Sequence, residues 1–199
     1  CTGMNVAAIR CQLTEMPDGM LDHCTSLTKI TMADSIKNNI RRIGVGTFYD
    51  CPKLTTFAFG DSVAKIDACG FMGCTGLGKV TLPESVKHIG HDAFSACQKM
   101  SEINIPANVD SIGDHAFKDA HALKQITMSD SVKYLGEQAF AYCQNLTSAK
   151  ISKSITEIRF KTFAGCTKLT DFTLSPNITI IADSAFQGVK CFDTLKLSN

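Results

Sequence analysis

The segment LPESVKHIGHDAFSAC, residues 82–97, decides the fold because its apolar skeleton recurs along the chain. The skeleton returns as IPANVDSIGDHAFKDA at residues 105–120 and as MSDSVKYLGEQAFAYC at residues 128–143. The apolar positions keep their spacing while the polar letters between them change. The proline, histidines, carboxylates and cysteine of the first copy are therefore interpreted first as part of a repeat.

Phenylalanine marks the 23-residue period of this repeat. It recurs at that constant interval, at Phe48, Phe71, Phe94, Phe117, Phe140, Phe163 and Phe186. Further apolar columns keep the same spacing, and together they read FxxCxxLxxIxLPxSVxxIGxxA. A fixed period of this length is the signature of a stacked repeat architecture, in which each unit packs only on its neighbours.

The repeat extends over residues 1–199, which predicts a single solenoid of about eight turns. Counted from the cysteine column, the turns start near residues 1, 24, 51, 74, 97, 120, 143 and 166, with a partial turn from 189. A longer, 27-residue interval separates Leu21 from Phe48, so the second turn carries an insertion of four, which lies within residues 35–44. We expect this insertion to form a bulge on one edge of the solenoid.

Two segments of each turn are predicted to be extended. The pattern LxxIxL alternates apolar and polar residues, which is typical of a half-buried strand, and one such strand per turn builds a parallel sheet. The β-branched pattern VxxI predicts a shorter strand on the opposite wall. The stretch GxxAFxxC is expected to close the turn as a hydrogen-bonded turn or a short 3₁₀ helix.

These columns resemble the BspA-type, or Treponema pallidum-type, leucine-rich repeats, which occur in surface proteins of bacteria and of some protozoan parasites. The resemblance covers essentially the whole chain; Ala120, Val189 and the 27-residue turn depart from the pattern. It implies a right-handed leucine-rich-repeat coil. It also implies a secreted or cell-surface, adhesin-like protein with a role in the cell adhesion and virulence of a pathogen, binding a host or matrix protein.

Composition argues against several other classes of function. The 199-residue chain has a net charge of +1 with its charged residues interspersed, so it lacks the basic stripe that nucleic-acid binding requires. It contains no uninterrupted apolar run long enough to cross a membrane, and no membrane span or signal peptide is recognised. No nucleotide-binding, hydrolase or metalloprotease motif is present, so neither catalysis nor a cofactor is expected.

The cysteines fall into two groups. Seven occupy one column of the repeat, where Ala120 and Val189 substitute for them: Cys1, Cys24, Cys51, Cys74, Cys97, Cys143 and Cys166. A position that accepts small hydrophobic residues predicts buried free thiols. Cys11, Cys69 and Cys191 lie outside this column and are the candidates for exposed reactivity or a disulfide.

Three histidines suggest a zinc site. His88 and His91 are separated by two residues, and His115 is expected near His91 on the next turn. No carboxylate or thiol in the same exposed rows completes a tetrahedral set. Other turns carry unrelated polar residues at these positions, so no metal site is predicted.

The outward residues of the predicted strands form two aligned rows, which are the candidate binding surface. One row reads Thr31, Ala58, Thr81, Asn104, Thr127, Lys150, Thr173 and Lys196. The flanking row reads Lys29, Thr56, Lys79, Glu102, Gln125, Ser148, Asp171 and Thr194. The threonines have a simpler explanation, since Thr favours strands and pairs with like neighbours. The flanking row changes chemistry from turn to turn, which favours recognition of a protein partner.

One local feature differs from the rest of the rows. In TFAFG, residues 56–60, Ala58 and Gly60 replace larger residues and predict a dip that exposes the edges of Phe57 and Phe59. Such a dip would form a shallow apolar pocket.

The sequence thus favours a non-catalytic protein-binding module. A structural spacer or scaffold segment of a longer protein is the alternative. A cytoplasmic interaction scaffold is a further alternative, because oxidising compartments disfavour seven unpaired cysteines.

Overall fold

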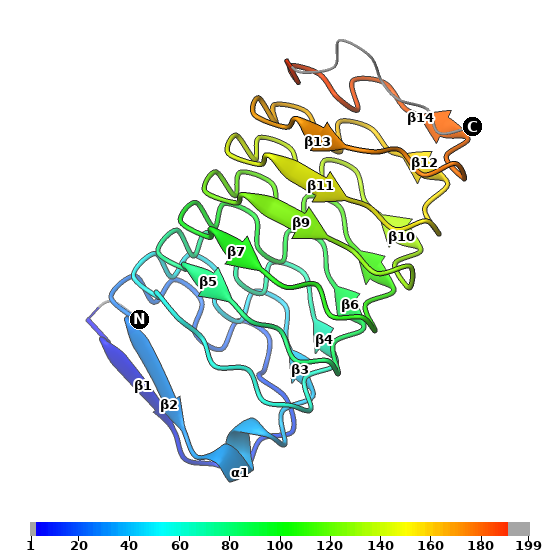
Figure 1. Cartoon of the computed structure of the whole chain (residues 1–199). Helices are drawn as coiled ribbons and strands as arrows, with labels where there is room; N and C mark the ends of the chain where they lie inside the picture. Colours follow the sequence, from blue (N-terminus) through cyan, green and yellow to red (C-terminus); the bar gives the residue numbers. More distant parts are fainter. Residues whose placement is uncertain (1–2, 191–199) are drawn as a thin grey trace.

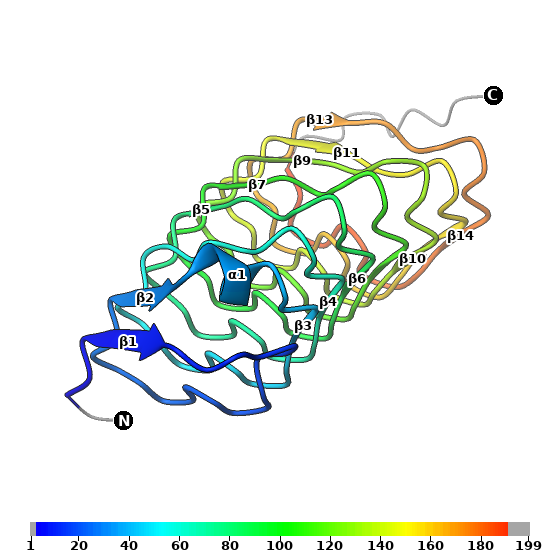
Figure 2. The same ribbon diagram turned by 90° about the horizontal axis from the view of Figure 1, so that it is seen from below.

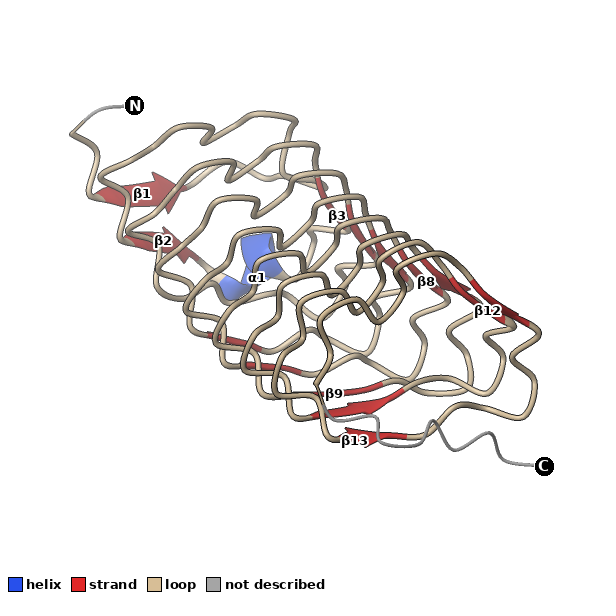
Figure 3. Ribbon diagram, turned by 90° about the horizontal axis from the view of Figure 1, so that it is seen from above, coloured by secondary structure: helices blue, strands red, loops and turns tan. Residues whose placement is uncertain are grey.

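The computed structural model describes residues 3–190, which coil into a parallel β-solenoid with one strand-bearing wall on each side. The first wall carries β1 (Val6–Ile9), β2 (Lys29–Met32), β5 (Lys79–Val80), β7 (Glu102–Ile103), β9 (Gln125–Thr127), β11 (Ser148–Lys150) and β13 (Asp171–Phe172). The second wall carries β3 (Arg42–Ile43), β4 (Lys65–Ile66), β6 (His88–Ile89), β8 (Ser111–Ile112), β10 (Tyr134–Leu135), β12 (Glu157–Ile158) and β14 (Ile180–Ile181). Figures 1 and 3 show the two series running along opposite sides of the coil. The solenoid fold predicted from the repeat is confirmed.

Strands of neighbouring coils pair in parallel with the register of the repeat. Lys79 pairs with Glu102 and Ile89 pairs with Ile112, so partners are separated by one repeat period. The second wall holds a five-stranded sheet in the order β10-β8-β6-β4-β3 and the pair β12-β14. The first wall holds the pairs β1-β2 and β5-β7 and the three-stranded sheet β13-β11-β9. The outward side of this first wall is called the strand face below.

The strand face is therefore less regular than expected. A strand was predicted in every coil, but residues 54–60, between β2 and β5, are not extended into a strand. The insertion lies beside this gap and forms the short helix α1 (Asp34–Lys37) rather than a β-bulge. Figure 2 shows α1 projecting between β2 and the following coil. A Cβ on Gly60 would lie 2.1 Å from the Lys37 carbonyl oxygen, so the helix fits there only because residue 60 has no side chain.

The phenylalanine column forms a stack of rings along the solenoid axis. From Phe71 to Phe163, successive rings lie 5.2–5.7 Å apart at interplanar angles of 1–11°. Phe48 through Phe163 are fully buried. Because each ring packs on the rings of the coils before and after it, the core holds neighbouring coils together.

A third side of each coil, the turn wall, follows the second wall. It comprises the turns at residues 45–50, 68–73, 91–96, 114–119, 137–142, 160–165 and 183–188. The second and sixth residues of these turns adopt positive φ, as Asp92 (51°) and Ala96 (57°) do. Between coils, the Phe94 amide donates to the Ala116 carbonyl at 2.8 Å. The stretch GxxAFxxC thus closes the coil as a hydrogen-bonded turn, one of the two forms expected.

Candidate functional site

The strand face presents most of the predicted row residues to solvent. Those that are exposed are Lys29, Thr56, Ala58, Lys79, Thr81, Glu102, Asn104, Gln125, Thr127, Lys150, Asp171 and Thr173. Thr31 and Ser148 are half-buried, whereas Thr194 and Lys196 lie outside the described residues. Side chains alternate between the two sides of each strand, so Val80, Ile103 and Ile126 point inward and are buried, as expected.

A groove of about 430 Å³ runs over β5, β7 and β9, and is called the face groove. Its lining contains Lys79, Val80, Thr81, Glu102, Ile103, Asn104 and Gln125. Five of these seven residues belong to the two predicted rows. The row residues of three successive coils therefore meet in one concavity on this face.

An ion pair crosses the face groove. Lys79 Nζ lies 2.9 Å from Glu102 Oε2, and both side chains are largely exposed. The hydrogen bond and the positive charge from Lys79 hold the pKa of Glu102 below its usual value. An exposed pair of this kind contributes little to stability, so both charges remain available to a partner.

Asn104 has a structural role that sequence reasoning missed. Its Oδ1 accepts from the Leu82 amide at 2.7 Å, and its Nδ2 donates to the Leu82 carbonyl at 2.9 Å. The side chain thus replaces backbone pairing where β5 and β7 end. It also fixes one end of the face groove, although Asn104 itself was predicted only as a contact residue.

The predicted apolar dip takes a different form from the one expected. A hollow of about 240 Å³ lies between β2 and the next coil, lined by Ile30, Thr31, Met32, Lys37, Phe57 and Ala58. Phe59 is half-buried and its ring packs against Phe57 and Phe71 at centroid distances of 4.7 and 5.6 Å. Gly60 is buried beneath α1. Phe57 and Ala58 thus line the hollow, whereas the expectation that Gly60 opens the dip is wrong.

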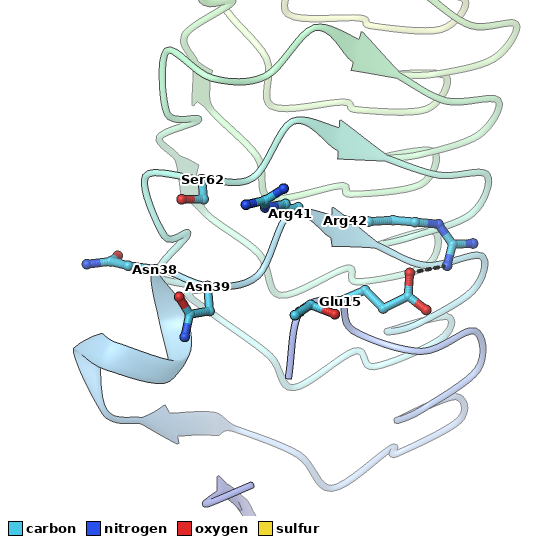
Figure 4. Close-up of a pocket in the computed structure, with 7 residues that line it drawn as sticks. Glu15, Asn38, Asn39, Arg41, Arg42 and Ser62 are labelled. Carbon is cyan, nitrogen blue, oxygen red and sulfur yellow. Dashed lines mark hydrogen bonds and ion pairs between the residues drawn. The ribbon is translucent and has the colours of Figure 1, made fainter. Parts of the chain in front are cut away.

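Another concavity was not predicted. It measures about 520 Å³, lies beside the insertion, and is lined by Thr14, Glu15, Asn38, Asn39, Arg41, Arg42 and Ser62 (Figure 4). The guanidinium of Arg42 binds Asp67, Asp18 at 2.7 Å and Glu15 at 3.3 Å. These partners raise the pKa of Arg42 further above its usual value. In the sequence, only the insertion within residues 35–44 pointed to this part of the surface.

Within residues 3–190, the column cysteines are buried free thiols as predicted: Cys24, Cys51, Cys74, Cys97, Cys143 and Cys166. Cys1 lies outside the described residues. The role of the buried thiols is more specific than that of a small apolar group. The Cys97 thiol donates to the Phe71 carbonyl at 3.2 Å, and the same bond recurs from Cys143 to Phe117. Burial raises the pKa of Cys51 to about 11, because a thiolate is poorly solvated in the core.

The remaining cysteines differ in exposure. Cys11 is exposed, Cys69 is half-buried, and both are free thiols, whereas Cys191 lies outside the described residues. Partial burial and the nearby charge of Asp92 raise the pKa of Cys69.

His115 lies near His91, as the repeat register predicted, with the ring centroids 5.0 Å apart. His88 Nδ1 lies 2.6 Å from the Ser111 hydroxyl on the second wall. His91 and His115 lie together on the turn wall with Asp92, and one potential ligand atom from each of the three lies within 4.8 Å of the others. The place of Asp92 beside these two histidines was not predicted. Asp92 precedes His115 by one repeat period, so the repeat register places it beside His115.

Within residues 3–190, no helix has the length and apolar character needed to cross a membrane.

The repeat described above matches the model of a known protein family. The model of the BspA type leucine rich repeat region matches residues 1–78 and 88–199 in six copies. The chain belongs to this family. No curated protein matches it in sequence.

Two solved structures share the fold. A T. pallidum leucine-rich repeat protein is 26% identical, with a TM-score of 0.74, and the match covers 84% of this chain and 78% of that one. A leucine-rich repeat protein from Eubacterium ventriosum is 17% identical, with a TM-score of 0.77, over 98% of this chain. The match spans 61% of the Eubacterium protein. At this identity, the second likeness shows the fold alone.

Proposed function

We propose that this BspA-type repeat chain is a non-catalytic protein-binding module, and that it binds its partner through the strand face. The face groove is the observation that supports this most directly. Row residues from β5, β7 and β9 meet there, and their chemistry changes from coil to coil although the fold places them identically. Packing alone requires only the inward residues to stay constant, so the outward variation is available for recognition.

The chemistry of the groove suits a polypeptide partner. Lys79 and Glu102 offer one charge of each sign, Gln125 offers an amide, and the apolar side chains of Val80 and Ile103 form part of its lining. Mixed polar and apolar contacts on a rigid concave surface are typical of protein interfaces. The partner we propose is a host or matrix protein, which extends to this chain the adhesin-like role that its family resemblance implies.

The proposed location is the cell surface or the extracellular medium. Seven column cysteines argued for a reducing compartment, but the six within the described residues are buried. Burial raises the pKa of several of these thiols, including Cys51 and Cys166. A thiol that stays protonated and inaccessible resists oxidation, so the cysteine content is compatible with an oxidising environment.

The experiment is binding of the purified chain to a panel of extracellular matrix and plasma proteins by biolayer interferometry. The test variant changes Lys79, Glu102 and Gln125 together to Ala. The matched control changes Lys133, Glu137 and Gln144 to Ala, the same residue types at exposed positions outside the strand face. Saturable binding that the first variant loses and the control keeps is expected. Equal binding by both variants, or binding to no protein, would contradict the proposal and favour a structural spacer.

A further inference from the structure

Two successive turns of the turn wall bring three metal-ligand side chains together. Asp92 and His115 each occupy the second position of their turn, one repeat period apart, and His91 precedes Asp92 directly. The Asp92 amide donates to the Asp114 carbonyl at 2.9 Å, which holds the two turns in register. Asp and His tolerate the left-handed conformation required at this position better than most residues. The cluster lies beyond β6, outside the strand face.

The distances within the cluster lie on either side of the spacing expected in a tetrahedral zinc site. His91 Nε2 lies 2.7 Å from Asp92 Oδ2, and His115 Nδ1 lies 3.6 Å from the same oxygen. The two imidazole rings are 5.0 Å apart and inclined at 64°. In a tetrahedral zinc site with bonds of about 2.0–2.1 Å, neighbouring ligand atoms are roughly 3.3 Å apart. The two measured distances differ from that value by about 0.6 and 0.3 Å, and side-chain rotations that shift the ligand atoms by these amounts would accommodate the ion.

We propose that His91, Asp92 and His115 bind a divalent transition-metal ion, with Zn²⁺ the best-fitting ion. Two imidazole nitrogens and one carboxylate oxygen are a common set of zinc ligands in proteins. His91 and His115 remain partly exposed, so the fourth position is open to water or to a side chain of another molecule. The ion would join two neighbouring coils through the side chains of their turns.

Gln138 supplies an outer-shell contact to this site. It occupies the equivalent turn position one repeat period after His115, and its Nε2 lies 3.0 Å from His115 Nε2. With the ion on His115 Nδ1, the other ring nitrogen carries the proton. Rotation of the Gln138 amide exchanges its oxygen and nitrogen, so that Oε1 accepts this proton. Such a partner orients a metal-bound histidine.

The architecture of the turns does not by itself require these three residues. The corresponding position pairs are Ala68 and Cys69, Glu137 and Gln138, and Phe160 and Lys161 in other described turns. Histidine and aspartate pairs at the surface contribute little to stability. The convergence of two histidines and a carboxylate in one place is therefore better explained by a ligand than by packing.

The test is a titration of the purified chain with Zn²⁺ in competition with a chromophoric chelator, under a non-thiol reductant. One ion per chain is expected to bind. His91→Ala and His115→Ala should lose more affinity than Gln138→Ala, for which roughly a 10- to 100-fold loss is expected. The matched control is His121→Ala, because His121 also pairs with a nearby carboxylate, at 3.5 Å from Asp119, and should bind as the parent does.

Cobalt and cysteine variants complete the test. Co²⁺ should give the absorption of a nitrogen- and oxygen-ligated ion without a thiolate charge-transfer band. Thermal melts in the absence of metal check that each variant remains folded. The proposal is overturned by failure of the parent chain to bind, or by folded His91→Ala and His115→Ala variants with unchanged affinity. Loss of the ion in Cys69→Ser or Cys11→Ser would overturn the three-ligand assignment.

Discussion

The regular coils around Phe94, Phe117 and Phe140 differ from the coils beside the insertion in one instructive way. In the regular region, neighbouring rings of the stack are nearly parallel, as Phe94 and Phe117 are at 1°. Beside the insertion, Phe48 and Phe71 still stack at 4.9 Å but are inclined at 25°. The core continues through the irregularity, while the strand face is interrupted at residues 54–60. A short insertion therefore changes the surface of the solenoid more than its core.

The surface consequences are local. The insertion creates the hollow beside Phe57 and the pocket beside Arg42, whereas the face groove lies over the regular coils. A repeat protein can in this way alter its outer shape in one coil without losing the contacts that hold neighbouring coils together.

The largest expected effect is loss of a ring from the regular stack. Phe117→Ala removes a fully buried side chain that stacks on Phe94 and Phe140, and should lower the free energy of unfolding by about 3–5 kcal/mol. Phe57→Ala, beside the insertion, should cost about 1–2 kcal/mol because Phe57 is only half-buried. Urea unfolding followed by circular dichroism measures both values. Equal losses would show that the two regions do not differ in packing.

A methyl group at Gly60 probes the irregular coil directly. Gly60→Ala places a Cβ 2.1 Å from the Lys37 carbonyl and should destabilise the chain by about 1–3 kcal/mol as α1 is displaced. Gly78→Ala is the matched control, because the nearest heavy atom to its Cβ, the Thr55 carbonyl oxygen, is 4.0 Å away. The control should change stability by less than about 0.5 kcal/mol. Thermal melts of both variants suffice, and a stable Gly60→Ala would contradict the packing of α1.

The thiol column should make stability fall at alkaline pH. The pKa of Cys51 is raised from about 9 to about 11, and that of Cys166 to about 12, by burial. Above pH 9 these thiols ionise in the unfolded chain but stay protonated in the folded one. Their contribution is therefore fully present below pH 9 and declines toward pH 11–12, by at most about 1.4 kcal/mol per pH unit for each thiol.

Unfolding of the reduced chain in urea at pH 8 and pH 10 measures this decline. Cys166→Ala should show a smaller difference between the two pH values than the parent, since Ala120 demonstrates that the column accepts alanine. An identical difference in parent and variant would show that this thiol is not shielded by the fold.

The smallest effect concerns the strand face. In the parent chain the pKa of Glu102 is below its usual value because of Lys79, and Lys79→Ala should return it toward that value. Carboxyl-carbon NMR titration measures the change. The melting temperature should be unaffected, since both side chains are exposed. An unchanged pKa of Glu102 in the Lys79→Ala variant would contradict the presence of this ion pair in the face groove.

The sequence was most informative where one coil packs on the next. Phe48 through Phe163 are buried as their 23-residue spacing predicted, because a stacked coil has no other way to cover its apolar edge. The sequence also predicted which strand residues point into the core and which point to solvent, as buried Ile103 and exposed Glu102 illustrate.

The sequence was least informative where a side chain bonds across coils or where the chain leaves the repeat. Asn104 was predicted as an outward contact residue and Cys97 as a small buried group, whereas both donate hydrogen bonds to backbone carbonyls of the preceding coil. The strand expected around Ala58 is absent because α1 lies over Gly60. Asp92 was not predicted beside the histidines, although the register of the repeat aligns it with His115.

The central claim is that partner recognition takes place on the strand face over the regular coils. Hydrogen–deuterium exchange of the chain, alone and saturated with a partner captured in the binding panel, tests it most directly. Protection at Lys79–Thr81, Glu102–Asn104 and Gln125–Thr127, with the second wall unchanged, is the predicted result. Protection centred on β4, β6 and β8, or confined to the insertion around α1, would contradict the claim.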